Sequence, residues 1–286
     1  MLFATGTMAR RIERAEAETA KEFGERALAR GMDVLIYGIG GTHAVFAGAG
    51  QPFNKLAALG FAPVDEADFA AIEAIYDARS AEIRVEQATL ADPAVATLLS
   101  RRGYTVIGYE NVLGLELAAA RERLARARDE DEARGIHVTR VTSADIDAWI
   151  ETVTDGFMQP DTFDGPPPAE SFPREAIEGV FAGIGSAAGT TLYLATRDGA
   201  IAGAGSLRTS SGLAQLAGAS TLPAHRRRGV QSALLRARLL DADESGCDLA
   251  VVTTEPASKS QQNVQRAGFA LLYARAVMVR AAASSQ

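Results

Sequence analysis

The stretch LPAHRRRGVQSALL, residues 222–235, decides the fold of the second half of this chain. The last strand of a predicted three-strand meander precedes it. Apolar residues at helical spacing then run through it and beyond, at Val230, Ala233, Leu234, Ala237 and Leu240. This pattern predicts a strand, a tight loop and a helix that begins near Gly229. The first N–H groups of such a helix lack intrahelical acceptors and carry the positive end of its dipole, so they suit a phosphate or pyrophosphate.

The residues before this helix favour the same anion. Arg226, Arg227 and Arg228 would add charge-assisted hydrogen bonds, and Gly229 lets the backbone approach a ligand closely. The whole chain is nevertheless acidic, with 29 Lys and Arg, 36 Asp and Glu, and a formal net charge of -7. Because nucleic acids and anionic membranes attract basic surfaces, we expect neither as a partner. The predicted anion site is therefore local.

Strands and helices alternate on both sides of this stretch. The second half predicts a strand at 136–141, a helix at 143–157 with Ser143 as its N-cap, an ordered proline-rich loop at 159–173, a three-strand meander at 190–221 with turns at 198–199 and 211–212, a strand at 249–255, a helix at 258–269 and a closing strand pair at 270–280. The first half predicts a helix at 8–30, two strands at 33–48, a third at 53–61, a helix at 64–79, a strand at 81–89, a helix at 92–104 and one or two strands at 105–117.

Two segments of the chain repeat one pattern. Residues 85–113 and 249–278 share a strand, a Thr, a short helix, a Gly followed by an aromatic residue and a strand, with Gly103 matching Gly268 and Thr89 matching Thr254. Two copies of one fold explain this similarity. The predicted fold class is α/β in the α+β sense, with a mixed, mostly antiparallel sheet flanked by helices in each copy. We assign 1–118 and 136–286 to the two domains and the charged segment 119–135 to a linker helix.

Cysteine, histidine and hydropathy exclude several classes of protein. Cys247 is the only cysteine, which rules out an internal disulfide and a thiolate metal cluster. His43 and His137 have no companion at metal-ligand spacing, so no metal is predicted. No apolar run approaches the roughly 20 residues that span a bilayer, and residues 1–18 lack the apolar core of a signal peptide. We expect a cytoplasmic protein.

The arginine stretch resembles a known family motif. Arg226-Arg227-Arg228-Gly229-Val230-Gln231, after a strand and Pro223, is similar to the pyrophosphate loop R/Q-x-x-G-x-G/A of the GNAT superfamily of acyl-CoA-dependent N-acyltransferases. The resemblance covers roughly residues 136–282 and extends to the order of strands and helices and to the Gly268-Phe269 ending. Gln231 departs from it, because the motif has a small residue at this position.

The resemblance implies an acetyl-CoA site and an amine acceptor. The strand before the loop would separate from its neighbour and offer backbone groups to the pantetheine and the thioester carbonyl, and the thioester would lie in the V between that strand and residues 249–255. A primary amine of a small molecule or peptide would attack the thioester directly. The implied cofactor-binding residues are Ala219, Ser220, Thr221, Arg226, Arg227, Arg228, Gly229, Val230, Gln231, Ser232, Ser258 and Asn263.

The acid and base are less determined by the sequence. Family members often carry a tyrosine four residues before the helix-ending glycine, where this chain has Val264. Tyr273 in the next segment is the substitute, with a half-buried strand aromatic as its alternative reading. Glu255 is the candidate base, directly or through water, although a carboxylate at a strand end can also cap a helix or face solvent. Ser258 can likewise be a helix cap.

The first half carries no counterpart of the arginine loop, since acidic residues at 65–68 follow its third predicted strand. We therefore expect a degenerate GNAT-like domain without a phosphate site. Two other functions stay open: a non-catalytic acyl-CoA-binding or regulatory module, and a nucleotide-binding oxidoreductase suggested by the glycines at 183–188. A homodimer is also open, and the sequence does not identify the acceptor.

Overall fold

The computed structural model describes residues 2–48, 51, 53–161, 173–185 and 187–282, which fall into two compact units. The C-terminal unit holds residues 112–161 and 173–272, and the N-terminal unit holds residues 3–111 and 273–282. These bounds follow packing, whereas the predicted domains follow a proposed duplication, so the division at 118 and 136 stays a prediction. The proline-rich segment 162–172 lies outside the described residues. Within the described ranges, no helix is both long enough and apolar enough to cross a membrane.

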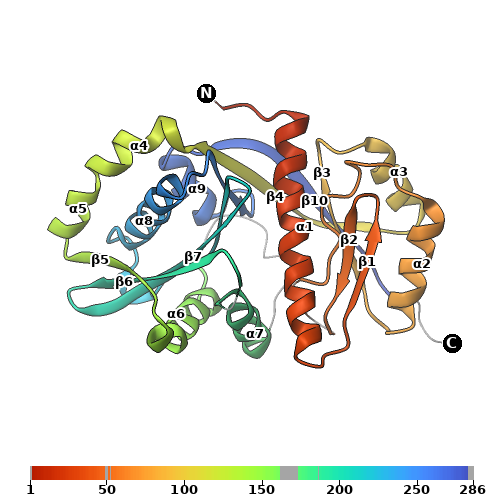
Figure 1. The fold of residues 1–286 in the computed structure, drawn as a ribbon, viewed down its shortest axis with the longest axis horizontal. Helices are drawn as coiled ribbons and strands as arrows, with labels where there is room; N and C mark the ends of the chain where they lie inside the picture. Colours follow the sequence, from red (N-terminus) through yellow and green to blue (C-terminus); the bar gives the residue numbers. More distant parts are fainter. Residues whose placement is uncertain (1, 49–50, 52, 162–172, 186, 283–286) are drawn as a thin grey trace. The chain divides into compact units, whose positions relative to one another are not determined.

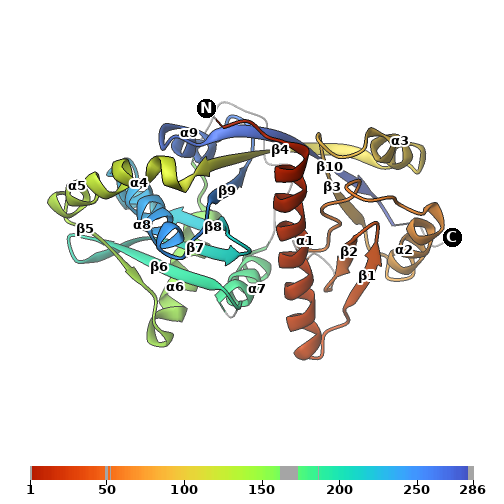
Figure 2. The ribbon, with the colours of Figure 1, turned by 45° about the horizontal axis from the view of Figure 1, so that its top comes forward.

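The C-terminal unit is a strand meander with helices on both faces, α6 and α7 on one and α8 on the other (Figures 1 and 2). Its strands run in the order β9-β8-β7-β6-β5, with antiparallel pairs throughout except for the parallel pair β8 and β9. Its elements are α4 (Leu117–Arg126), α5 (Arg128–Ala133), β5 (Ile136–Arg140), α6 (Ile146–Met158), α7 (Arg174–Gly185), β6 (Thr190–Arg197), β7 (Ala200–Ser210), β8 (Leu213–Thr221), α8 (Val230–Glu244), β9 (Leu249–Thr254) and α9 (Lys259–Arg266).

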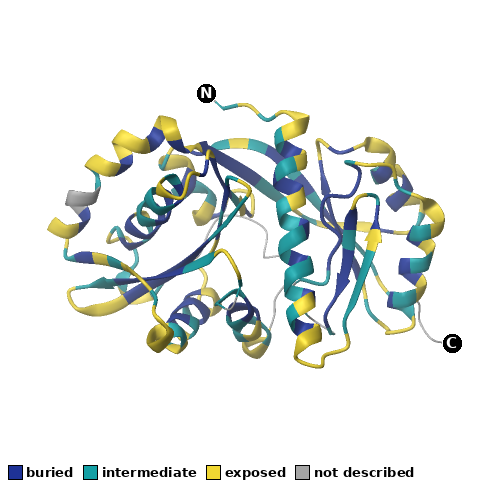
Figure 3. Ribbon diagram, in the orientation of Figure 1, coloured by how far each residue is buried: buried dark blue, intermediate teal, exposed yellow. Residues whose placement is uncertain are grey.

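The N-terminal unit has a smaller set of elements around its own core. They are α1 (Gly6–Ala29), β1 (Leu35–Ile39), β2 (Thr42–Phe46), α2 (Glu66–Asp77), β3 (Ile83–Ala88) and α3 (Pro93–Arg101). Side chains of Asp65 and Asp92 accept the orphan N–H groups at the starts of α2 and α3, which explains where these helices begin. Helices α2 and α3 bury one side and expose the other (Figure 3), as their apolar spacing predicts.

Two long strands, β4 (Thr105–Glu116) and β10 (Ala270–Arg280), contribute residues to both units. The two repeated segments are β3-α3-β4 and β9-α9-β10. The last strand of each repeat lies beside the first strand of the other, because β10 pairs antiparallel with β3 and β4 neighbours β9. The repeat predicted from the sequence is thus present, and its copies exchange their final strands.

Three sequence predictions of local structure are wrong. Residues 53–61 form no strand, since only Leu56 pairs with its neighbours and the left-handed residues Ala58 and Gly60 turn the chain. Residues 270–280 form one strand, because they contain no turn residue that could divide it. Ser143 is not an N-cap: residues 143–145 form a 3₁₀ turn, and Thr142 precedes it with its hydroxyl donating to Asp145 Oδ2 at 2.7 Å.

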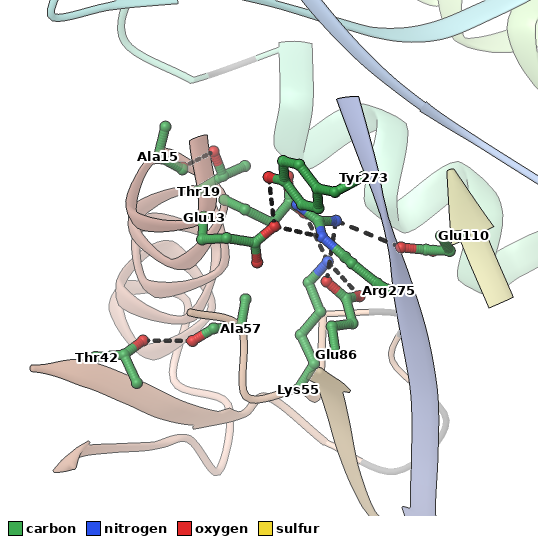
Figure 4. Close-up of polar contacts among 11 residues, drawn as sticks. Glu13, Ala15, Thr19, Thr42, Lys55, Ala57, Glu86, Glu110, Tyr273 and Arg275 are labelled. Carbon is green, nitrogen blue, oxygen red and sulfur yellow. Dashed lines mark hydrogen bonds and ion pairs between the residues drawn. The ribbon is translucent and has the colours of Figure 1, made fainter. Parts of the chain in front are cut away.

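A buried charge network joins α1, β3 and β10 in the N-terminal unit (Figure 4). Arg275, 1% exposed, donates from Nε to Glu13 Oε1 at 2.7 Å and lies 3.4 Å from a carboxylate oxygen of Glu86 and of Glu110. The other members are Lys55, which donates to Glu16 Oε1 at 2.6 Å and Glu86 Oε1 at 2.8 Å, and Tyr273, whose hydroxyl donates to Glu13 Oε1 at 2.8 Å. Carboxylates outnumber cations in this network, and Glu13 Oε2 is buried without a hydrogen-bond partner among the described residues.

This excess negative charge predicts a pH-dependent stability. Burial and the neighbouring Glu86 raise the pKa of Glu110 to about 7, against the opposing charges of Arg275 and Lys55. Because the folded-state pKa is above the unfolded value, the folded state binds the extra proton, and its stability falls as pH rises from about 5 to 8. At pH 8.5, the free energy of unfolding of Glu110→Gln should exceed that of wild type by on the order of 2 kcal/mol, so the variant should unfold at a higher urea concentration. At pH 5 the two proteins should be equally stable.

Urea unfolding followed by circular dichroism at several pH values checks this expectation. Glu122→Gln, an exposed carboxylate on α4 with a side chain 92% exposed, is the matched control. If Glu110→Gln and wild type lost stability in parallel between pH 5 and 8.5, burial of Glu110 would have no such effect.

Candidate functional site

The loop before α8 has the geometry of an anion site. Strand β8 ends at Thr221, a 3₁₀ turn spans Pro223–His225, and the first backbone hydrogen bond of α8 runs from Ala233 N to Gly229 O at 3.0 Å. Within the described part of the chain, the consecutive N–H groups from Arg227 to Ser232 have no backbone acceptor. Free N–H groups at the positive end of a long helix bind phosphate groups.

Glycine at 229 fits the backbone of this loop. Gly229 adopts φ +91°, the left-handed region that an L side chain rarely enters, and it is the N-cap of α8. A Cβ at this position would also approach Arg134 Nη1 and Ile136 Cδ1 at 3.4 Å. Val230, Ala233 and Leu234 are buried behind it, as the sequence predicts, and fix the start of the helix against the sheet.

The three loop arginines have different environments. Arg226 is bound within the chain, since it donates to the carbonyl oxygens of Thr221 and Gln159 and lies 3.3 Å from Asp161 Oδ1. Arg227 and Arg228 are exposed, and neither has an ion-pair or hydrogen-bond partner in the ranges that the structure describes. Arg226 thus orders the loop, and the other two guanidinium groups are available to a ligand.

Strands β8 and β9 form the predicted V. Their parallel pairing covers only Leu213–Gln215 with Leu249–Val251. Beyond Gln215 no pairing joins them, so the ends of the strands diverge. Thr221 and Thr254 stand at those ends, and each has a buried hydroxyl oxygen without a partner among the described residues. A buried unsatisfied hydroxyl costs about 1–3 kcal/mol, so these positions suit a polar ligand.

A β-bulge in β8 lies beside the V and was not predicted from the sequence. Ala204 pairs with Ser220 and Ser206 with Ala217, which leaves Gly218 and Ala219 opposite the single residue Gly205. A bulge of this kind removes backbone groups from the sheet ladder and leaves them for a ligand. The signal that could have found it is the run of glycines at 203, 205 and 218, since glycine within a strand often marks a bulge.

The other predicted site residues divide into two groups. In the C-terminal unit, Glu255 is exposed directly after β9, the Ser258 hydroxyl caps α9 by accepting from Gln261 N at 3.1 Å, and Asn263 is partly buried on α9. Gln231 is partly buried in the first turn of α8, and Ser232 is exposed there.

Tyr273 belongs to the N-terminal unit instead. It is 5% exposed, its hydroxyl donates to Glu13, and burial raises its pKa, so its surroundings do not favour the release of a proton. Val264, the other acid position considered, is a core residue. No residue among these has the exposure and freedom of a proton donor, and the acid stays unassigned.

Helix α2 of the N-terminal unit contrasts with α8. The Asp65 side chain already accepts Ala67 N at 2.8 Å, and Glu66 and Asp68 lie in the first turn. These carboxylates repel an anion, as expected for a copy without a phosphate site.

The glycines at 183–185 end α7 and precede β6, so they lack the strand-to-helix context of a dinucleotide site. The described residues hold no group of three or more His, Cys, Asp or Glu that could bind a metal.

Comparison with known proteins bears on the family and the fold. Residues 155–269 match the model of the acetyltransferase (GNAT) family. The fold resembles a GCN5-related N-acetyltransferase from Kribbella flavida, with a TM-score of 0.60 and 18% identity over 92% of this chain and 94% of that one. It also resembles a tandem GNAT protein from the clavulanic acid biosynthesis pathway, with a TM-score of 0.56 and 16% identity over 77% of this chain and 70% of that one. No curated protein matches the sequence. These likenesses cover both halves of the chain and establish the fold.

Proposed function

We propose, from the GNAT-family domain that residues 155–269 form, that this protein transfers the acetyl group of acetyl-CoA to a primary amine of a small molecule or peptide. The observation that carries the proposal is the start of α8, where free N–H groups from 227 to 232 lie beside two unpaired guanidinium groups. A pyrophosphate matches this arrangement in charge and in hydrogen-bonding capacity.

The V between β8 and β9 would then receive the pantetheine and the thioester. Ala219, Ser220 and Thr221 would offer backbone groups to it, and the bulge at 218–219 would stabilise the oxyanion that forms when the amine attacks. Ser258 and Asn263 would line the cofactor from α9. The resulting thiolate and the protonated amine adduct exchange a proton as CoA leaves, and no metal takes part.

Glu255 is the proposed base. It is exposed and follows β9 directly, so at the open end of the V it would accept the proton of the attacking ammonium directly or through water. Tyr273 is left out of the proposal because its hydroxyl is committed to Glu13. We retain a cytoplasmic location, where acetyl-CoA is available, and the N-terminal unit as a copy without a cofactor.

Calorimetric titration with acetyl-CoA tests the proposal first, and absence of binding at millimolar cofactor would refute it. A panel of primary amines is then assayed for release of the CoA thiol. Binding without thiol release across the panel would favour the second candidate, a non-catalytic acyl-CoA-binding module, for which the unassigned acid is the supporting observation. Binding of NAD in place of CoA would favour an oxidoreductase.

Glu255→Gln should lower kcat by about 100-fold with whichever amine supports thiol release, and leave the affinity for acetyl-CoA unchanged. The physical reason is that an amide cannot accept the ammonium proton. Raising the pH should restore part of the rate, since more of the amine is then neutral. Steady-state kinetics from pH 6 to 9, with Glu122→Gln as control, measure this, and a Glu255→Gln rate equal to wild type would assign Glu255 to helix capping or solvent.

A further inference from the structure

Arg238 is a buried cation without a buried anion to balance it. It lies in the middle of α8 and is 2% exposed. Its Nε donates to Leu234 O at 3.1 Å, and its Nη1 donates to Ser206 O at 3.1 Å and lies 3.4 Å from Ala217 O. All three partners are neutral carbonyl groups, and no carboxylate pairs with Arg238 among the described residues.

The nearest acidic candidate on the same helix is engaged elsewhere. Asp241 accepts the Tyr193 hydroxyl at 2.5 Å and pairs with Arg140 at 2.7 Å. Burial lowers the pKa of Arg238 to about 10, with the nearby Tyr193 acting in the opposite direction, so the guanidinium is still charged at neutral pH. A buried charge balanced only by carbonyl dipoles is expensive, and an apolar residue here would pack at a lower cost.

Two of the carbonyl groups that Arg238 contacts, those of Ser206 and Ala217, lie directly beside the β8 bulge. Ser206 and Ala217 are the first paired residues on one side of Gly218 and Ala219. The guanidinium lies against Gly205, the residue opposite the bulge, where an added Cβ would be 3.2 Å from Arg238 Cζ. Gly205 therefore makes room for the cation at the interruption of the ladder between β7 and β8.

Gly205, Ser206 and Ala217 are also held by hydrogen bonds that do not involve α8. Trp149 on α6 is fully buried and donates from Nε1 to Gly205 O at 3.1 Å, and the Ser206 hydroxyl donates to Ala217 O at 3.0 Å. The bulge is thus fixed between α6 and α8, and Arg238 supplies the only charged group in this set of described contacts.

We propose that Arg238 is a positioning residue for the acyl subsite: it holds the bulge at Gly218 and Ala219 in the shape that presents backbone groups to the thioester carbonyl, and its charge polarises those groups. This inference rests on the proposed acetyl-CoA site. A positive charge beneath a hydrogen-bond donor strengthens the donor where negative charge develops, and a low-dielectric interior preserves that effect.

The test separates the acyl carbonyl from the pyrophosphate. Calorimetry with the CoA thiol measures binding through the loop, because this probe has the pyrophosphate and no acyl carbonyl. Difference infrared spectroscopy with acetyl-CoA labelled at its carbonyl carbon measures polarisation of the thioester through the C=O stretching frequency. The variants are Arg238→Met, Arg238→Lys and Gly205→Ala, which displaces the guanidinium without removing it. Arg236→Met on the same helix is the matched control, since Arg236 pairs with Asp131 at 2.8 Å.

We expect wild type and Arg236→Met to lower the C=O frequency of bound acetyl-CoA relative to the free cofactor. Arg238→Met and Gly205→Ala should return it toward the free value while CoA affinity stays within about 3-fold of wild type, and Arg238→Lys should recover part of the shift. If Arg238→Met does not fold, the C=O frequencies measured with Arg238→Lys and Gly205→Ala test the inference instead. An unchanged frequency in the folded variants, or a CoA affinity that falls in step with it, overturns the inference. A wild type that binds no CoA overturns the proposed function itself, before any variant is compared.

Discussion

Replacing Arg227 and Arg228 together by alanine lowers the affinity for acetyl-CoA by about 100-fold or more, as we expect from the loss of two charge-assisted contacts of about 1.5–3 kcal/mol each. Both side chains are exposed and have no partner in the described part of the chain, so the substitutions break nothing in the free protein. Loss of affinity should therefore come without loss of stability. Isothermal titration at low salt and thermal melting measure the two quantities on the same samples.

The control for this pair of substitutions is Arg236→Ala, a basic residue of the same helix that is bound to Asp131 by two hydrogen bonds of 2.8 and 2.9 Å. It should leave acetyl-CoA affinity unchanged and reduce stability slightly. The wild-type affinity should also fall with added salt, and the double variant should show a smaller salt dependence because it neutralises less phosphate charge. A double variant that binds within 3-fold of wild type, by about the precision of such titrations, would place the pyrophosphate elsewhere.

Arg275→Met should lower the free energy of unfolding by about 3–5 kcal/mol, the second large effect we expect. The substitution keeps the volume of the side chain but removes the cation that contacts Glu13, Glu86 and Glu110. Lys55 and the partly exposed Arg84 are then the cations left near Glu86 and Glu110. Carboxylates buried without a partner either repel one another or take up protons, and both outcomes reduce stability at neutral pH.

Chemical unfolding of Arg275→Met and of Arg101→Met compares the loss of a buried arginine charge with the loss of an exposed one. Arg101 pairs with Glu66 at 3.4 Å, but both side chains are more than half exposed, at 67% and 62%. Arg101→Met should lower the free energy of unfolding by less than about 1 kcal/mol, because surface ion pairs contribute little to stability. Adding Glu13→Gln to Arg275→Met should restore part of the lost stability, since it removes one of the unpaired charges. An Arg275→Met protein as stable as the Arg101→Met control would show that the network carries little of the stability of the N-terminal unit.

The features that the sequence predicts well are those set by near neighbours in the chain. Gly229 needs a left-handed backbone, the apolar spacing from Val230 to Leu240 needs one face of a helix, and both lie within one short segment. The meander turns at 198–199 and 211–212 belong to the same class, because Asp198, Gly199, Ser211 and Gly212 all adopt positive φ.

What the sequence does not predict depends on partners far along the chain. The bulge at 218–219 exists only in the register that pairs β7 with β8. The proposed positioning role of Arg238 depends on that bulge. Tyr273 was expected near the acyl site because it follows the helix of the C-terminal repeat, but strand exchange places it against Glu13, 260 residues earlier. Local alternation likewise favoured a strand at 53–61, where Ala58 and Gly60 turn the chain after a single bridge.

The exchange of β4 and β10 sets an order for folding during synthesis. Strand β3 is made early, yet its neighbour β10 comprises residues 270–280 and leaves the ribosome only after the C-terminal unit has been translated. The N-terminal unit must therefore wait with an open sheet edge, which is a template for unwanted pairing. Arg275 arrives on that same strand, so Glu13 receives this cation only when β10 pairs with β3, whereas Glu86 already has Lys55 as a partner. Until β10 is available, the edge of β3 that it occupies in the folded protein is unpaired.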